Sequence, residues 1–108
     1  MHIKSYLATL ELVNHERVAL GLAPIERLPQ GQPRDPMDCA IARAVPGSVV
    51  DGIHIKPPSS ALQRRLPPEV RKFVAAFDRG ARRGAAALDP ALLVEGGIDD
   101  DKGCLVSV

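Results

Sequence analysis

The segment from Leu66 to Gly80 constrains the fold more than any other part of the chain. Prolines open it at 67 and 68, a glycine follows it at 80, and large apolar residues recur between them at helical spacing: Val70, Phe73, Val74 and Phe77. Proline suits the first turn of a helix, and glycine suits the position after the last turn. The pattern therefore predicts an amphipathic helix that begins at Pro68 and buries this apolar face.

A first helix is predicted from Ser5 to Leu22. Gly21 is a plausible stop, and Pro24 confirms that the helix has ended. Apolar residues fall near one stripe of this helix, which we expect to be buried: Ile3, Leu7, Leu10, Val13 and Val18. Residues 24–36 follow as an irregular connector rich in proline and glycine.

A second helix is predicted to begin at Asp35. Asp35 is a good N-cap, Pro36 suits the first helical position, and Asp38 stands where a capping partner would. The expected buried stripe consists of Met37, Ile41 and either Ala44 or Val45. Pro46 and Gly47 end the helix.

A β-hairpin is predicted between Ser48 and Lys56. Two β-branched runs flank Asp51-Gly52, a dipeptide typical of a two-residue type I′ turn. Val50 would then face Ile53, and Val49 would face His54. Since a lone hairpin is marginal in water, we expect it to lie against the helices.

Together these elements predict an α+β fold: a small domain of about three helices packed with a short antiparallel β-hairpin. We assign residues 1–80 to this compact domain and 81–108 to a flexible C-terminal extension. In that extension, Asp89-Pro90 begins a short helix through Val94. Its apolar residues must fold back on the core or find another chain, so the sequence is compatible with a monomer or a homodimer: Leu88, Leu92, Leu93 and Val94.

Composition narrows the class of protein. The 108 residues suffice for one small domain, and two Phe, one Tyr and no Trp limit stacking platforms for single-stranded nucleic acid. Two cysteines make no disulfide framework. With no signal peptide and no apolar run of membrane-spanning length, we expect a cytoplasmic protein without membrane contact.

Charge is unevenly distributed. Residues 64–83 are strongly basic, whereas acidic residues dominate from Asp89 onward. The basic stretch provides one candidate site, for nucleic acid: Arg71, Lys72, Arg79, Arg82 and Arg83. Such a face is more often solvated surface, and no helix-turn-helix pattern accompanies it.

Cys39 is the residue that an enzymatic alternative would use. It lies near a helix N-terminus, which can lower the pKa of a thiol, but a small buried side chain packed beside Met37 and Ile41 is the simpler interpretation. The spacings of the cysteines and of the three histidines match no zinc pattern. We therefore expect no catalytic residues, no metal and no cofactor.

The C-terminal tail is the candidate site for a protein partner. Asp99, Asp100 and Asp101 form an acidic spacer, and an apolar end follows it: Leu105, Val106 and Val108. The arrangement broadly resembles the acidic tail of single-strand-binding proteins, and such a peptide can dock in a groove or add a strand to a sheet. Residues 63–66 also resemble, weakly, the Gln-x-x-Leu part of sliding-clamp-binding peptides, which suggests the replication machinery.

Three segments carry a resemblance to a family. They are residues 21–24 (Gly-Leu-Ala-Pro), Cys39 with residues 41–44 (Ile-Ala-Arg-Ala), and the helix of residues 66–80. They resemble short, poorly characterised proteins of mycobacteriophages and other actinobacterial phages, whose second segment reads Cys-Pro-Ile-Ala-Arg-Ala; Ala40 here replaces the proline. The resemblance spans residues 5–80, and the tail departs from it.

The resemblance implies an early, non-structural phage protein of a kind sometimes toxic to the host, with no known chemistry. Our leading hypothesis is therefore a non-enzymatic, host-interacting protein that acts by binding a host protein in the bacterial cytoplasm. A small nucleic-acid-associated protein is the alternative, and an enzyme dependent on Cys39 comes third.

Overall fold

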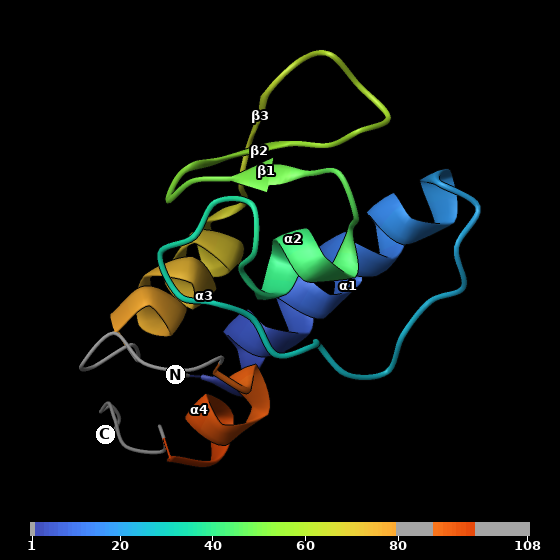
Figure 1. The fold of residues 1–108 in the computed structure, drawn as a ribbon. Coiled ribbons are helices and arrows are strands. Elements are labelled where there is room, and N and C mark those ends of the chain that lie inside the picture. Colours follow the sequence, from blue (N-terminus) through green and yellow to red (C-terminus); the bar gives the residue numbers. More distant parts are fainter. Residues whose placement is uncertain (1, 80–87, 97–108) are drawn as a thin grey trace.

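Four helices and a three-stranded antiparallel sheet form the part of the chain that the structure, a computed structural model, describes: residues 2–79 and 88–96 (Figure 1). The helices are α1 (Ile3–Ala19), α2 (Ala40–Ala44), α3 (Pro68–Arg79) and α4 (Pro90–Gly96). The strands, in sheet order, are β1 (Val49–Val50), β2 (His54–Lys56) and β3 (Arg64–Arg65). The predicted α+β class is confirmed.

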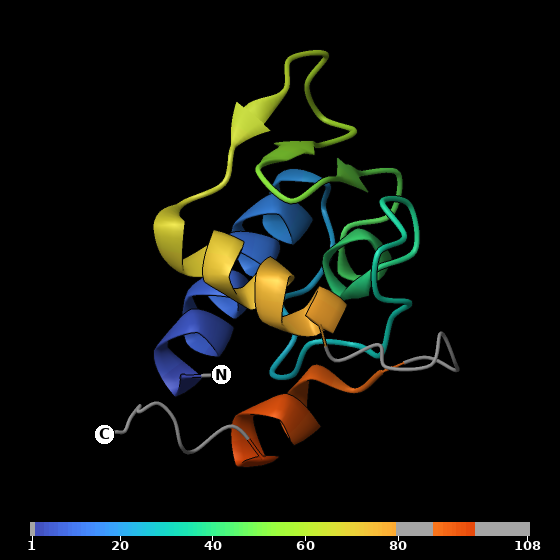
Figure 2. The same cartoon turned by 90° about the vertical axis from the view of Figure 1, so that its left-hand side faces the viewer.

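The sheet lies at one end of the molecule and α4 at the other, with the remaining helices between them (Figures 1 and 2). The core is centred on α3, whose predicted face is confirmed: Val70, Phe73, Val74 and Phe77 are all buried. Phe73 stacks on Phe77 with ring centroids 5.8 Å apart, and Tyr6 of α1 meets the edge of Phe73 at 6.5 Å. These aromatic contacts join α1 to α3.

The predicted burial of α1 is wrong, although the helix itself is confirmed. Ile3 and Leu7 are each 54% exposed and Val18 is 60% exposed; of the predicted stripe, Val13 alone is fully buried. The buried face instead consists of Ser5, Tyr6, Thr9, Val13 and Glu16. Its polar groups have partners: the Thr9 hydroxyl donates to the Ser5 carbonyl, and the Tyr6 hydroxyl accepts from Leu28 N–H. Hydrogen bonding therefore allows a largely polar face to be buried.

α1 ends at Ala19, before the predicted Leu22, and Gly21 terminates it. Gly21 has φ +79°, its N–H donates to Val18 O, and Leu22 N–H donates to Arg17 O. These bonds form a Schellman motif, in which glycine adopts the left-handed conformation without steric cost.

The predicted start of α2 is wrong. Asp35 does cap a turn, since its carboxylate accepts Met37 N–H at 3.0 Å, but the turn does not continue as a helix. Cys39 is extended (ψ 174°) and becomes the N-cap of a helix that begins at Ala40. Met37, predicted to be buried, is 73% exposed, whereas Ile41, Ala44 and Val45 are buried as predicted.

The predicted hairpin is present, but its register differs. Val50 pairs with Ile55 and Val49 with Lys56, so the turn residues are Gly52 and Ile53. The carboxylate of Asp51 accepts the N–H groups of both Ile53 and His54, which fixes this turn, and Gly52 lacks the positive φ of a type I′ turn. The third strand, β3, was not predicted.

α4 confirms the predicted short helix after Asp89. The Asp89 carboxylate accepts Ala91 N–H at 2.9 Å and caps the helix. Leu88, Leu93 and Val94 pack against the core, while Leu92 is 57% exposed. The predictions for residues 81–87 and for the tail from Gly97 fall outside the described residues. In the described ranges, every helix is too short or too polar to cross a membrane.

The contact between Ser5 and Glu69 makes the stability of the α1–α3 pair depend on pH. Ser5 is buried, and its hydroxyl donates to Glu69 Oε1 at 2.8 Å. This bond is the main cause that holds the pKa of Glu69 below the ordinary 4.5. Lys72 lowers the same pKa to a smaller extent, through its hydrogen bond and its charge. Because the folded-state pKa is depressed, the stabilisation is present above the unfolded pKa and is lost as pH falls through the folded one.

Ser5→Ala is therefore expected to lower the free energy of unfolding by about 1 kcal/mol near neutral pH. The difference from the parent should shrink as pH falls through the lowered folded-state pKa of Glu69, because the carboxyl is then protonated in both states. Urea unfolding followed by circular dichroism measures it, with the exposed Ser59→Ala as control. A difference that stays constant down to low pH would show that packing, not the ionised carboxylate, is responsible.

Candidate functional site

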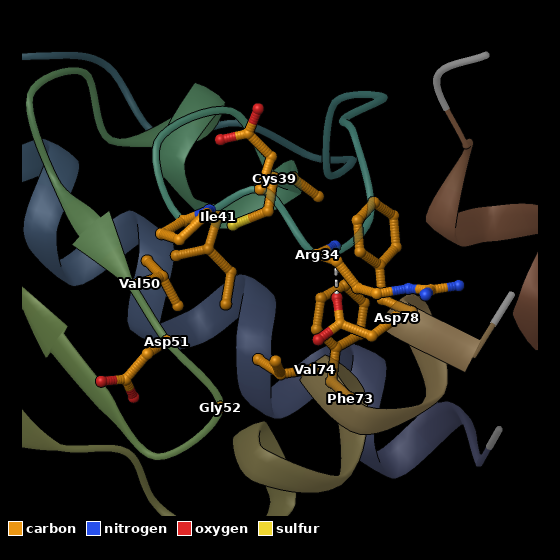
Figure 3. A pocket seen from close by; sticks show the side chains of 13 residues that line it. Arg34, Cys39, Ile41, Val50, Asp51, Gly52, Phe73, Val74 and Asp78 are labelled. Carbon is orange, nitrogen blue, oxygen red and sulfur yellow. Dashed lines mark hydrogen bonds between the residues drawn. The ribbon is translucent and has the colours of Figure 1, made fainter. Parts of the chain in front are cut away.

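A pocket of about 230 Å³ opens between the loop before α2, the β1–β2 turn and α3 (Figure 3). Its floor is apolar and belongs to the core: Cys39, Ile41, Val50, Phe73, Val74 and Phe77. Its rim carries four charged residues: Arg34, Asp35, Asp51 and Asp78. The pocket therefore combines an apolar interior with a rim of three carboxylates and one guanidinium.

Hydrogen bonds to the backbone hold the loop that forms one wall. Arg34 N–H donates to Asp78 Oδ1 at 2.8 Å, the dashed line of Figure 3, and Arg34 has φ +63°. Val50 N–H donates to Pro36 O at 2.8 Å, which ties the same loop to β1. The wall is thus fixed at both sides, by α3 and by the sheet.

Each rim carboxylate accepts backbone N–H groups. Asp35 accepts that of Met37, Asp78 that of Arg34, and Asp51 those of Ile53 and His54. The two bonds to Asp51 lower its pKa, so this carboxylate stays ionised well into the acidic range. A rim that holds three aspartates in place favours a ligand that carries positive charge beside its apolar part.

Cys39 is a floor residue of the pocket and is 8% exposed. Burial raises the pKa of its thiol; hydrogen bonds from the N–H groups of Ala42 and Ile41 oppose that shift, but their effect is smaller. Because the thiolate is the nucleophilic form, this environment disfavours nucleophilic chemistry at neutral pH.

The basic residues predicted for nucleic acid lie on α3, where the structure describes them. Arg71 is half-buried, and Lys72 and Arg79 are exposed. Lys72 Nζ lies 3.2 Å from Glu69 Oε2, which partly neutralises it. Arg82 and Arg83 fall outside the described residues.

The candidate partner-binding residues of the tail also fall outside the described residues: Asp99, Asp100, Asp101, Leu105, Val106 and Val108. Leu66, the apolar residue of the clamp-like segment, is 2% exposed and is a core residue. It is therefore not presented to a partner in the folded chain.

The sequence did not predict the pocket. The sequence predicts a capping role for Asp35 and a turn role for Asp51, and both residues have local roles of that kind, yet both also stand at the rim. Their proximity depends on the bond from Val50 N–H to Pro36 O, and the bond from Arg34 N–H to Asp78 brings α3 to the same rim. The one local signal was the density of aspartates beside apolar runs.

Within residues 2–79 and 88–96, His, Cys, Asp and Glu side chains form no group of three that could hold a metal ion. Compared with protein families, with curated proteins and with solved structures, the chain matches none of them. The case for a function therefore depends on the pocket and on the residues quoted above.

Proposed function

We propose that the chain is a non-enzymatic accessory protein of an actinobacterial phage that acts by binding a host protein inside the bacterial cell. Two observations support the proposal: the resemblance to phage proteins over residues 5–80, and the apolar pocket with its acidic rim. The pocket is the observation that carries it, because interfaces are anchored by a few side chains that enter well-packed apolar pockets.

The occupant that fits the pocket is an apolar side chain of the host protein flanked by lysine or arginine. A volume of about 230 Å³ accommodates one large side chain rather than a whole cofactor. The rim residues Asp35, Asp51 and Asp78 outnumber Arg34, so a basic neighbour gains electrostatic attraction. The tail, with its acidic spacer and apolar end, is a second contact in the proposal.

The test is affinity purification from a mycobacterial lysate with tagged full-length chain, a form truncated after Gly97, and pocket variants. Asp35→Asn, Asp51→Asn and Asp78→Asn each keep an oxygen that accepts the backbone bonds but remove the charge. The matched control is Glu26→Gln, an exposed carboxylate outside the pocket. Truncation separates the contribution of the tail from that of the folded domain.

We expect to recover one dominant host protein. Its affinity should be about tenfold lower for the variant with all three asparagines than for the parent chain, and unchanged for Glu26→Gln. A partner whose affinity does not depend on the rim would exclude the pocket. Recovery of nucleic acid alone, in a salt-sensitive manner, would favour the alternative.

A further inference from the structure

The outer face of α1 carries two large apolar residues near its N-terminus that are more than half exposed. Ile3 and Leu7 are each 54% exposed, and Leu10, at the edge of this face, is partly exposed and also packs against the core. Ile3, Leu7 and Leu10 follow one another at spacings of four and three residues, as apolar residues do along the contact line of two paired helices. These three residues form the seam of α1. Leu7 and Leu10, together with Ala8 between them, line a shallow hollow on this face.

Two opposite charges flank this seam on one side. Lys4 and Glu11 also line the hollow, are exposed, and stand seven residues apart, two turns along the same face. In a pair of parallel helices, Lys4 and Glu11 of the two copies would lie on opposite sides of the seam, so the two charges would not meet. In an antiparallel pair whose two-fold axis passes between Leu7 and Ala8, Lys4 of each copy lies level with Glu11 of the second copy.

The charge pattern thus makes the surface complementary to itself under a two-fold axis, the commonest symmetry of homo-oligomers. We propose that a second copy of the chain docks here, through an antiparallel contact of α1 with α1. Leu7 and Leu10 of both copies form the apolar centre, and Ile3 extends it. Asn14 ends the seam, because its side chain exchanges two hydrogen bonds with the backbone of Ile25.

A seam of two helical turns is small beside the interfaces of obligate dimers, so this dimer is weak and depends on concentration. None of its residues lines the pocket near Cys39, so the dimer leaves that pocket open. The inference therefore stands apart from the proposed host-binding function, and either can fail without the other.

The test is sedimentation equilibrium of the full-length chain over a wide range of concentration. We expect a monomer–dimer equilibrium, and Leu7→Asp is expected to raise the dissociation constant at least about tenfold by placing a charge at the centre. The control is Leu62→Asp, which adds the same charge at a side chain 74% exposed elsewhere. Both side chains are exposed, so neither change threatens the fold.

Charge reversal tests the antiparallel geometry. Lys4→Glu and Glu11→Lys should each weaken the dimer, and the double variant should restore it, because the pairs reform with their signs exchanged. A chain that stays monomeric at about 1 mM would overturn the proposal. So would a dimer insensitive to Leu7→Asp, and a double variant no stronger than the single ones would overturn the antiparallel arrangement.

Discussion

Gly31→Ala is expected to lower the free energy of unfolding by about 3 kcal/mol or more, although it adds a single methyl group. A Cβ at position 31 would stand 2.2 Å from the backbone N of Ala40 and 2.5 Å from the backbone C of Cys39. Both contacts are with backbone at the start of α2, so no side chain can turn aside to relieve them. The connector and α2 must separate instead.

Gly31 is held on its other side as well. Its N–H donates to Leu88 O at 3.1 Å, and its carbonyl accepts Leu88 N–H at 2.8 Å. A shift away from α2 would therefore strain the bridge that joins the connector to the segment preceding α4. For a domain of this size, the expected loss corresponds to a fall in melting temperature of roughly 12–24 °C.

Gly52→Ala is the matched control. A Cβ at Gly52 meets no atom within 4 Å, and Gly52 is exposed. Its stability should stay within about 0.5 kcal/mol of the parent. Thermal unfolding of the two variants in parallel tests this prediction. Equal melting temperatures would mean that the connector shifts away from α2 at little cost, despite the close approach of Gly31 to the backbone of Ala40.

Local sequence patterns correctly predicted elements of two kinds: those whose buried face consists of apolar residues at regular spacing, and those whose first residue is marked by a cap. Phe73 and Phe77 mark the buried face of α3 by spacing alone, and Asp89 marks the start of α4 by its capping chemistry. The face of α1 could not be predicted in this way. Burial of Ser5 and Glu16 depends on Glu69 and Arg64, and no periodicity in α1 encodes partners that lie 64 and 48 residues away.

The register of the hairpin, the third strand and the pocket could not be predicted from the sequence for a related reason. Asp51 and Gly52 favour a hairpin, but the choice of turn residues follows from which N–H groups the Asp51 carboxylate accepts. The pocket is assembled from three segments, around Asp35, Asp51 and Asp78, that meet only once the chain has folded. Sequence patterns report local geometry well, whereas sites made from distant segments depend on tertiary contacts.

The pair formed by Glu16 and Arg64 should respond asymmetrically to substitution. Glu16 of α1 has a side chain 4% exposed, and Arg64 Nη2 of β3, whose side chain is 50% exposed, donates to its Oε2. Removal of the arginine leaves a buried carboxylate without its counter-charge, which is costly. Removal of the glutamate leaves an arginine that water can still solvate.

Arg64→Met, which keeps much of the apolar stem, is therefore expected to cost about 3 kcal/mol, and Glu16→Met within about 1 kcal/mol. The double variant should resemble Glu16→Met, because no charge is then left buried. Urea unfolding of the parent and three variants gives the coupling energy directly. Equal costs for the two single variants would show that Glu16 is hydrated in solution and that β3 is not tied to α1 through this pair.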